Sequence, residues 1–457
     1  DGNVQVTRDG GANWSLCNDG IKGIPANTWV PHIHASSHNP GEALVVFDDH
    51  RRNNWIPYVF HTANYGKTWT RIVDEDDVEG FVYVAIQDPA EPNLMFCGTD
   101  VGLYFSIDAG HSWSRWKNGY PTTPTRDLVV HPRDGDLVIG TFGRAIWILD
   151  DIRPLRAIAA DAQVLNQPMT AFEAPNAILA IIGESHGYRD GKVGEVLYNG
   201  ENRPYGALLS CYLKELEGQT DTIEVEISDA QGEVVRNLQH IVEADGVQRF
   251  TWDLSRNAPR SPNVAKPDQP RFYRGEAVLP GTYTVTFSCR GHQASASVQV
   301  IPDPRLDRSV QEMSAKDDVI RQHYAQVEQM TAIADQIRDL EELTGWIRQR
   351  AAEQEIDLVS PLKSLSGDLK MMKERLLGKR VQGIYRQPEV IVSILGQTNY
   401  LLDGVLQPFS PNQAFQLKYQ DEACGQYAAD WEAFLAGKFA EFKQTVVDAG
   451  ISVFNDR

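Results

Sequence analysis

One short pattern occurs three times near the start of the chain and constrains its fold more than any other feature. The pattern is Ser/Thr-x-Asp/Asn-x-Gly-x-x-Trp. Its polar side chains can bond turn amides, its glycine permits positive φ, and its tryptophan can cover the apolar side of a hairpin. We therefore predict structural turns, here called boxes, at Thr7, Asp9, Gly11 and Trp14; at Thr62, Asn64, Gly66 and Trp69; and at Ser106, Asp108, Gly110 and Trp113.

A longer repeat runs through the segments that precede the boxes. Gly98-Thr99 and Gly140-Thr141 each follow a short apolar run, and their glycines are 42 residues apart. Short alternating strands with this period predict the four-stranded blades of a β-propeller. Within residues 1–153 we expect the outer half of one blade, two whole blades and three strands of a last blade, at residues 1–20, 27–74, 80–117 and 124–151.

The boxes resemble the Asp-boxes of the bacterial neuraminidase repeat, which sialidases, xyloglucanases and the sortilin propeller share. The segment from Gly140 to Asp151 is similar to the one that closes the propeller in large secreted bacterial proteins described as sortilin-like or glycosyl hydrolase repeat proteins. Phe142 and Ala145 stand where that family usually has His and Gly. The resemblance extends into the next domain, and it implies an extracytoplasmic bacterial protein, either periplasmic or secreted.

The blades counted in this way do not complete a ring. About three and a half blades are fewer than the four or more that a closed propeller needs. An open stack would expose an edge strand and the apolar faces between blades. We therefore expect further blades as partners, either upstream in the same precursor or on another chain. The start at Asp1, without a Met, favours a processed or N-terminally incomplete polypeptide.

A second domain is predicted after the blades. Residues 154–204 are rich in Ala, Pro and Gly and predict a connector, while residues 205–303 alternate like the strands of a β-sandwich. The sequence from Pro280 to Tyr283 resembles part of the immunoglobulin-like domain of bacterial secreted proteins. Cys211 and Cys289 lie on strands near the two ends of this domain, so a disulfide and two buried free thiols both remain open.

Residues 304–457 predict an antiparallel helical bundle. Apolar residues recur there at steps of three and four, which predicts helices near 309–354, 361–378, 388–406 and 411–449. Ser309 with Glu312 forms a capping box in the sequence. Ser360 and Ser410 each precede a proline and are expected to cap the second and fourth helices.

Two motifs suggest chemistry, and each has a plainer interpretation. His32 and His34 lie two apart on one strand, with His50 nearby, so they are candidate metal ligands. The plainer interpretation is polar residues at strand ends, and we predict no cofactor. The sequence 183–187, Gly-Glu-Ser-His-Gly, matches a nucleophile elbow, but the glycine-rich sequence after it does not predict the helix that an elbow requires. A loop is expected instead.

The enzyme hypothesis rests on the glycosidase relatives of the boxes. A glycosidase needs two carboxylates, and a sialidase also needs clustered arginines. No pattern marks the available arginines as convergent, and the catalytic residues are left unassigned. The arginines considered are Arg51, Arg52, Arg126, Arg133 and Arg144.

Charge and composition exclude some functions. The chain has 43 basic and 62 acidic residues, a net charge of −19, which argues against binding to nucleic acid or anionic lipid. No apolar run is long enough to span a bilayer.

The function that we expect is that of a non-catalytic scaffold or protein-interaction module with a protein partner. The alternative is a sialidase-like or xyloglucanase-like glycoside hydrolase whose active site lies largely on the missing blades.

Overall fold

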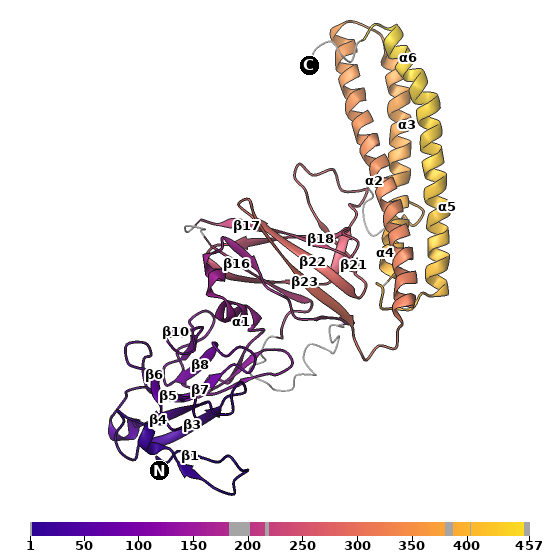
Figure 1. Cartoon of the computed structure of the whole chain (residues 1–457). Coiled ribbons are helices and arrows are strands. Elements are labelled where there is room, and N and C mark those ends of the chain that lie inside the picture. The colour runs from indigo at the N-terminus through magenta and orange to yellow at the C-terminus, as the bar shows by residue number, and fades with distance from the viewer. Residues whose placement is uncertain (1, 182–201, 215–218, 380–386, 403, 452–457) are drawn as a thin grey trace.

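The computed structural model describes residues 2–181, 202–214, 219–379, 387–402 and 404–451. Small antiparallel sheets lie at the N-terminal end of the elongated chain, a two-sheet unit follows, and long helices extend from it (Figure 1). The chain is therefore mostly β-structure followed by a helical region. Among the described residues, no helix is both long and apolar enough to cross a membrane.

Three antiparallel sheets follow one another in the N-terminal part. Sheet I contains β3 (Trp29–Ala35), β4 (Ala43–Asp48), β5 (Tyr58–Thr62) and β6 (Thr70–Val73). Sheet II contains β7 (Val82–Gln87), β8 (Met95–Thr99), β9 (Leu103–Ser106) and β10 (Ser114–Arg115). Sheet III contains β11 (Thr125–Val130), β12 (Leu137–Thr141) and β13 (Ile146–Leu149). The hairpin of β1 (Gln5–Val6) and β2 (Ser15–Leu16) precedes sheet I.

The sheets stack because each presents apolar side chains on both faces. Val46 and Val59 of sheet I are fully buried in one cluster with Met95 of sheet II. On the other face of sheet II, Phe96 packs in a cluster with Leu137 of sheet III. Alternation along each strand sends neighbouring side chains to opposite faces, so sheet II is covered on both sides. This stack fits part of a propeller.

The middle unit consists of two facing sheets around one apolar core. The strands are β14 (Met169–Ala171), β15 (Ala177–Leu179), β16 (Ala207–Leu213), β17 (Asp221–Ser228), β18 (Val234–Val242), β19 (Gly246–Trp252), β22 (Gly281–Cys289) and β23 (His292–Pro302). One sheet has the order β14-β16-β19 and the other β15-β23-β22-β17-β18. Side chains from both sheets, including Trp252 and Phe287, share the core. A separate pair, β20 (Ser255–Ala258) and β21 (Tyr273–Ala277), lies beside them.

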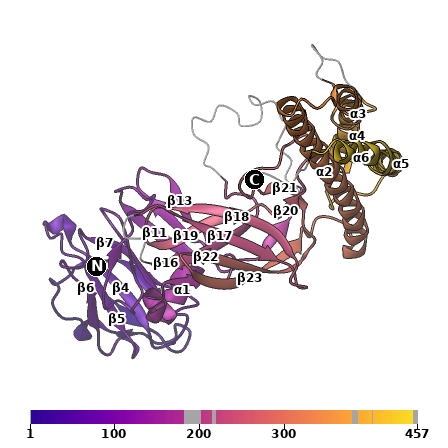
Figure 2. The same ribbon diagram turned by 90° about the horizontal axis from the view of Figure 1, so that it is seen from above.

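The segment that the sequence presents as a connector differs from that expectation. It contains α1 (Arg153–Ala160), and both β14 and β15 pair with strands of the middle unit. Strands of three residues are too short to show an alternating pattern in the sequence. β14 and β15 form because they pair with the edges of the two sheets. Arg249 on β19 donates to the carbonyl oxygens of Asp150 and Asp151, which joins the middle unit to the end of sheet III. Figure 2 shows this junction from above.

The helical region contains α2 (Val310–Glu353), α3 (Val359–Leu377), α4 (Ile391–Leu402), α5 (Pro411–Phe434) and α6 (Ala440–Asp448). The predicted capping boxes at Ser309 and Ser410 are present. The predicted cap at Ser360 is wrong: α3 begins at Val359, whose N–H donates to Asp357. The proline after Ser360 is accommodated because the first turn needs no intrahelical N–H donor.

The last predicted helix, residues 411–449, is continuous in the structure but is not α-helical throughout. A π-helical turn at Leu435–Phe439 separates α5 from α6, and Trp431 and Phe434 stack at its start with ring centroids 5.2 Å apart.

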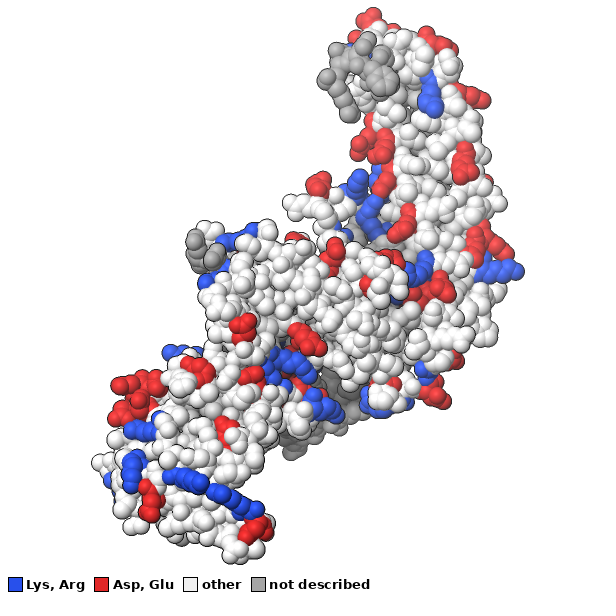
Figure 3. Space-filling view, viewed as in Figure 1, with Lys and Arg blue, Asp and Glu red and all other residues white. Residues whose placement is uncertain are grey.

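On the face drawn in Figure 3, the acidic and basic side chains of the described residues are interspersed. This mixed surface is unlike the continuous basic surface that nucleic acids bind.

Candidate functional site

The three boxes fold in the same way and use their polar groups internally. In the third box, Gly110 N–H donates to Ser106 Oγ and Ser112 N–H donates to Asp108 Oδ1, both at 2.9 Å. Equivalent bonds occur in the other two boxes. The glycine has a φ of +85°, a conformation that a Cβ would strain. The box side chains therefore shape turns and offer few groups to a ligand.

The hydrogen bonds within the boxes lower the pKa values of the box carboxylates Asp9 and Asp108. The backbone N–H of Asn13, helped by its side chain and by Thr7, lowers the pKa of Asp9 to about 2. At Asp108, burial raises the pKa, but hydrogen bonds from Ser112 and Ser106 outweigh it and the net pKa is lowered. Because both pKa values are lower in the folded chain, these bonds stabilise the turns above about pH 4 and are lost as the pH falls further.

Aromatic side chains gather at the ends of the sheets that lie away from the boxes. Trp29 pairs with Asp48 at one end of sheet I, whereas the second box begins at Thr62, which pairs with Ala43 at the other end. We call the surface at the box-free ends the aromatic edge. It consists of Trp29, His50, Trp55, Phe81, Tyr83, Arg126 and Phe142.

Apart from Trp29, the rings of the aromatic edge form a connected series from sheet I to sheet III. His50 stacks on Phe81 with centroids 4.3 Å apart, and Phe81 lies 4.8 Å from Tyr83. The Arg126 guanidinium lies 3.9 Å from the Tyr83 centroid and 5.4 Å from that of Phe142. Cations over ring faces hold such arrangements in place. The three sheets therefore share one surface at this edge.

Part of this surface is open to solvent. The exposed fractions are 49% for Trp29, 53% for Trp55 and 68% for Phe142. Isolated exposed aromatic residues are common, but a connected row of them marks a surface suited to binding. The guanidinium of Arg51 lies 4.9 Å from the Trp29 ring and adds a second cation to the row.

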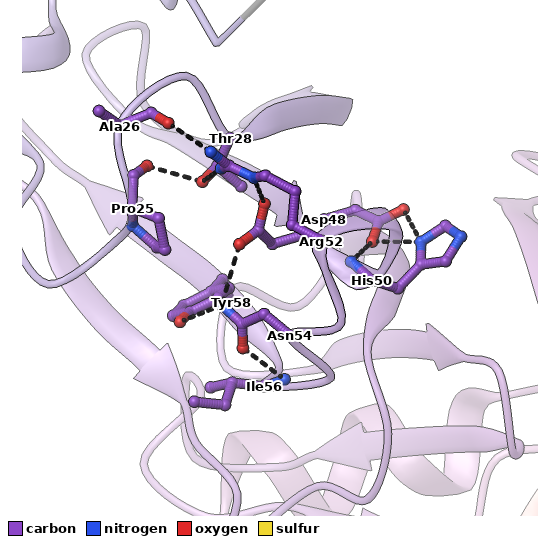
Figure 4. Close-up of polar contacts among 10 residues, drawn as sticks. Pro25, Ala26, Thr28, Asp48, His50, Arg52, Asn54, Ile56 and Tyr58 are labelled. Carbon is purple, nitrogen blue, oxygen red and sulfur yellow. Dashed lines mark hydrogen bonds and ion pairs between the residues drawn. The ribbon is translucent and has the colours of Figure 1, made fainter.

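The loop between β4 and β5, which carries Trp55, is fixed by buried polar contacts (Figure 4). Arg52 Nε donates to Asp49 at 2.6 Å, and the other end of its guanidinium donates to Thr28 Oγ1 at 3.0 Å. Asn54 Nδ2 donates to Asp49 at 3.1 Å. Asp49 is 5% exposed, so its charge needs these partners. The loop is thus held in one shape without a ligand.

A carboxyl group lies directly beside the rings. Phe81 N–H donates to Asp100 Oδ1 at 3.1 Å. Burial raises the pKa of Asp100 and the charge of Glu79 adds to this, while two backbone hydrogen bonds and His50 oppose it. A Cβ on Gly80 would lie 1.9 Å from the Asp100 carboxylate, so this approach requires glycine. Asp100 therefore keeps its proton to a higher pH than a free aspartate.

A second carboxylate, that of Asp48, bonds to His50 of the aromatic edge. Asp48 Oδ1 bonds to His50 Nδ1 at 2.7 Å (Figure 4). The edge thus combines exposed rings, a carboxyl group whose pKa is raised by burial and a histidine-bonded carboxylate. Such groups can bind a flat polyhydroxylated molecule and can transfer a proton to it.

The candidate metal ligands are dispersed in the structure. His50 belongs to the aromatic edge, whereas His32 and His34 lie on β3 beside the backbone of β7. Burial lowers the pKa of both His32 and His34. Among the residues that the structure describes, no group of three or more His, Cys, Asp or Glu side chains could hold a metal ion.

The other candidates from the sequence are also separated. Arg51 and Arg126 lie at the aromatic edge, Arg52 braces its loop, and Arg133 pairs with its neighbour Asp134. The sequence 183–187 lies outside the described residues. The cysteines named above, Cys211 and Cys289, are buried free thiols whose pKa values are raised by burial.

A cavity of about 730 Å³ lies between the middle unit and the helices. Two of its tyrosine hydroxyls already accept backbone hydrogen bonds: Tyr205 from Ala180 and Tyr324 from Glu276. These two hydroxyls therefore serve packing. The aromatic edge, where Trp29, Trp55 and Phe142 are exposed, is the stronger candidate site.

Sequence reasoning did not find the aromatic edge. The available signal was that aromatic residues stand near the starts of inner strands, as Trp29, Phe81 and Tyr83 do. Asp100 gave no local signal, because its role depends on contacts with a different strand.

Comparisons with known proteins found a distant similarity to a xyloglucanase. No family model matches the sequence. The chain is 29% identical over 160 residues to a probable oligoxyloglucan-reducing end-specific xyloglucanase of Neosartorya fischeri. The match covers 32% of this chain and 18% of the fungal protein, so the chain spans less than a fifth of that relative's length. The sequence is thus distantly similar to a xyloglucanase over about a third of its length.

Solved structures of the same kind are similar only in part. The GH74 enzyme of Niastella koreensis is 14% identical with a TM-score of 0.24, covering 59% of this chain and 38% of the enzyme. The GH74 xyloglucanase of Xanthomonas campestris is 12% identical with a TM-score of 0.21, covering 58% and 38%.

Proposed function

We propose that residues 1–153 are blades of an Asp-box propeller of the glycoside hydrolase type, and that the aromatic edge binds a glucan chain. The observation that carries the proposal is the series of aromatic rings, in which the exposed Trp55 and Phe142 are joined through the buried Phe81 and through Tyr83 and Arg126. A pyranose ring has apolar C–H faces and peripheral hydroxyls, so it loses apolar surface to water when it lies on an aromatic face. The distant similarity to a xyloglucanase supports a β-glucan as the ligand.

The proposal extends to the middle unit, to further blades and to the compartment in which the protein acts. The middle unit is an immunoglobulin-like sandwich, and the whole protein acts in an extracytoplasmic compartment of a bacterium, where polysaccharides are met. Further blades complete the ring. A non-catalytic binding role and a hydrolytic role share the same aromatic edge, and the similarity to a xyloglucanase favours the hydrolytic one.

Binding tests the aromatic edge directly. Trp29→Ala and Trp55→Ala should each weaken the binding of xyloglucan oligosaccharides, measured by isothermal titration calorimetry, by about tenfold, which is about 1.4 kcal/mol. Trp14→Ala is the matched control, since Trp14 is 59% exposed but lies in a box at the opposite ends of the sheets. Equal weakening by Trp14→Ala, or none by the other two, would contradict glucan binding at this edge.

Measurements of hydrolysis test whether Asp100 acts as the proton donor. If Asp100 donates a proton to the leaving oxygen, Asp100→Asn should lower kcat/KM for xyloglucan by about 100-fold or more while oligosaccharide binding is kept. Because the pKa of Asp100 is raised and the protonated form is the active one, the rate should fall as the pH rises through that pKa. Release of reducing ends at each pH measures this. Binding without any release would favour the non-catalytic role.

A further inference from the structure

The cavity between the middle unit and the helices is formed by elements that are far apart in the sequence. Its volume of about 730 Å³ lies within the range of roughly 300–1,000 Å³ that small-molecule sites occupy. One wall comes from the middle unit and from β21, and the other comes from α2, α4 and residues 404–407. Figures 1 and 2 both show β21 beside α2. The cavity therefore exists because these two units pack together.

The two walls approach each other closely at glycine residues. A Cβ on Gly275 of β21 would lie 2.7 Å from Tyr324 Oη of α2. A Cβ on Gly404, whose φ is +68°, would lie 3.0 Å from the Glu276 carboxylate. A side chain at either position would press the walls apart. The cavity is thus a hollow between walls that touch, and its shape is fixed by their contacts.

Three tyrosines line the cavity, and no described residue accepts the protons of their hydroxyl groups. Tyr205 Oη accepts the Ala180 N–H at 3.1 Å, and Tyr324 Oη accepts the Glu276 N–H at 2.9 Å. Burial raises the pKa values of Tyr205 and Tyr324, so both hydroxyls keep their protons. Tyr273 Oη is buried and has no hydrogen-bond partner among the described residues. Native structures rarely leave buried hydroxyls unpaired, so we expect a ligand that supplies acceptors.

The charged groups of the lining nearly balance. Arg274 Nε donates to the Asp253 carboxylate, and the Arg274 side chain is 70% exposed. Burial raises the pKa of Asp253, but hydrogen bonds from Ser255 and Arg274 outweigh it, and the net pKa is lowered. Glu276 adds a second carboxylate. His323 is neutral at pH 7, because burial lowers its pKa. One guanidinium and two carboxylates thus leave the lining with little net charge.

Side-chain amides complete the polar part of the lining. Asn399 of α4 hydrogen-bonds to His323, whose Nδ1 bonds to Gln420 Oε1 at 2.9 Å. Because Gln420 is fully buried, these bonds anchor Asn399 to the interior of the helical region. Gln407 supplies a second amide. Apolar side chains lie between the polar groups and include Pro259, Pro262, Val327, Leu395 and Leu406.

We propose that this cavity binds a neutral polyhydroxylated molecule, a short oligosaccharide, between the middle unit and the helices. Sugar hydroxyls both donate and accept hydrogen bonds, which matches the mixture of carboxylates, amides and phenolic hydroxyls on the two walls. The C–H faces of a sugar ring match the apolar side chains and the tyrosine rings. An ion would instead need a surplus of opposite charge, which the lining lacks. This site is separate from the aromatic edge and does not depend on glucan binding there.

Two neutral trisaccharides that differ in linkage, cellotriose and maltotriose, serve as probes. The protein is the 457-residue chain carrying Trp29→Ala and Trp55→Ala, so that binding at the aromatic edge does not contribute. At least one trisaccharide should bind saturably in isothermal titration calorimetry. At saturation it should slow hydrogen exchange of the Ala180 and Glu276 amides, which bond to the cavity tyrosines, by about tenfold, or about 1.4 kcal/mol. Exchange of the β8 amides in sheet II should not change.

Variants of this protein locate the binding. Gly396 on α4 lines the cavity, and a Cβ placed on it meets nothing within 4 Å. Gly396→Leu should therefore fold, since leucine favours a helix, and should weaken trisaccharide binding by about tenfold. Gly425→Leu is the matched control, at a glycine on α5 that has the same open space. Arg274→Ala should also weaken binding, whereas Arg133→Ala, at an exposed arginine of sheet III that pairs with an aspartate, should not.

Three outcomes would overturn the proposal. The first is that neither trisaccharide binds saturably. The second is that Gly396→Leu and Gly425→Leu bind a trisaccharide equally well. The third is that putrescine, a diamine, or citrate, a polyanion, protects the Ala180 and Glu276 amides while neither trisaccharide does, which would assign the cavity to an ion.

Discussion

Replacing Trp113 by alanine should lower the free energy of unfolding of the stacked sheets by about 3–5 kcal/mol. Trp113 is 8% exposed and lies in the apolar cluster between sheets I and II. Its indole Nε1–H donates to the carbonyl oxygen of Ile72 in sheet I at 2.8 Å, so the variant also leaves that oxygen without its partner. Native-state hydrogen exchange of the β8 amides measures the change locally.

The first box provides the matched control for this prediction. Trp14 occupies the same box position, but it is 59% exposed and its indole donates to Gly11 within its own turn. Trp14→Ala should therefore cost less than about 1 kcal/mol. A loss below about 1 kcal/mol for Trp113→Ala would mean that the third box does not join the two sheets.

Replacing Arg156 by methionine should destabilise the sheets by about 3–5 kcal/mol. Arg156 on α1 makes two bonds to Asp88 of sheet II, Nε to Oδ1 at 2.9 Å and an amino group to Oδ2 at 2.8 Å. The Asp88 side chain is fully buried, so the variant leaves a carboxylate whose remaining donors are the N–H groups of Ala90 and Glu91. Urea unfolding followed by circular dichroism measures the loss.

An exposed ion pair separates the effect of burial from the effect of charge. The Arg133 side chain is 82% exposed and bonds to Asp134 at 2.7 Å. Arg133→Met should change the free energy of unfolding by less than about 1 kcal/mol. The double variant Arg156→Met with Asp88→Asn should recover part of the loss, because no buried charge remains. Equal effects of the two arginine variants would contradict the role assigned to Arg156.

The parts that the sequence predicts well are those set by neighbours along the chain. A box needs residues within eight positions of one another, and the same turn bonds form in all three copies. Ser309 and Ser410 cap helices because the residues three positions later reach back to them. Ser360 fails as a cap because Asp357, just upstream, binds the first free N–H instead.

The candidate site could not be predicted in the same way. Burial raises the pKa of Asp100, and the Phe81 N–H that binds its carboxylate lies 19 positions earlier in the sequence. The row of rings forms because β3, β7 and β11 begin at the same edge of the stack. Neither fact follows from a motif, since each depends on how whole sheets are placed against one another.

The sequence by itself determined the boxes, their period and the change from strands to helices, because turn chemistry and side-chain periodicity act over a few residues. Only the tertiary structure decided which ends of the sheets carry an open aromatic surface. It also decided that, in the part of the chain that the structure describes, Val129, Ile146 and Ile148 are exposed, whereas the equivalent positions of sheet II are buried. Whether a sheet face is buried depends on what packs against it, and no local sequence pattern shows that.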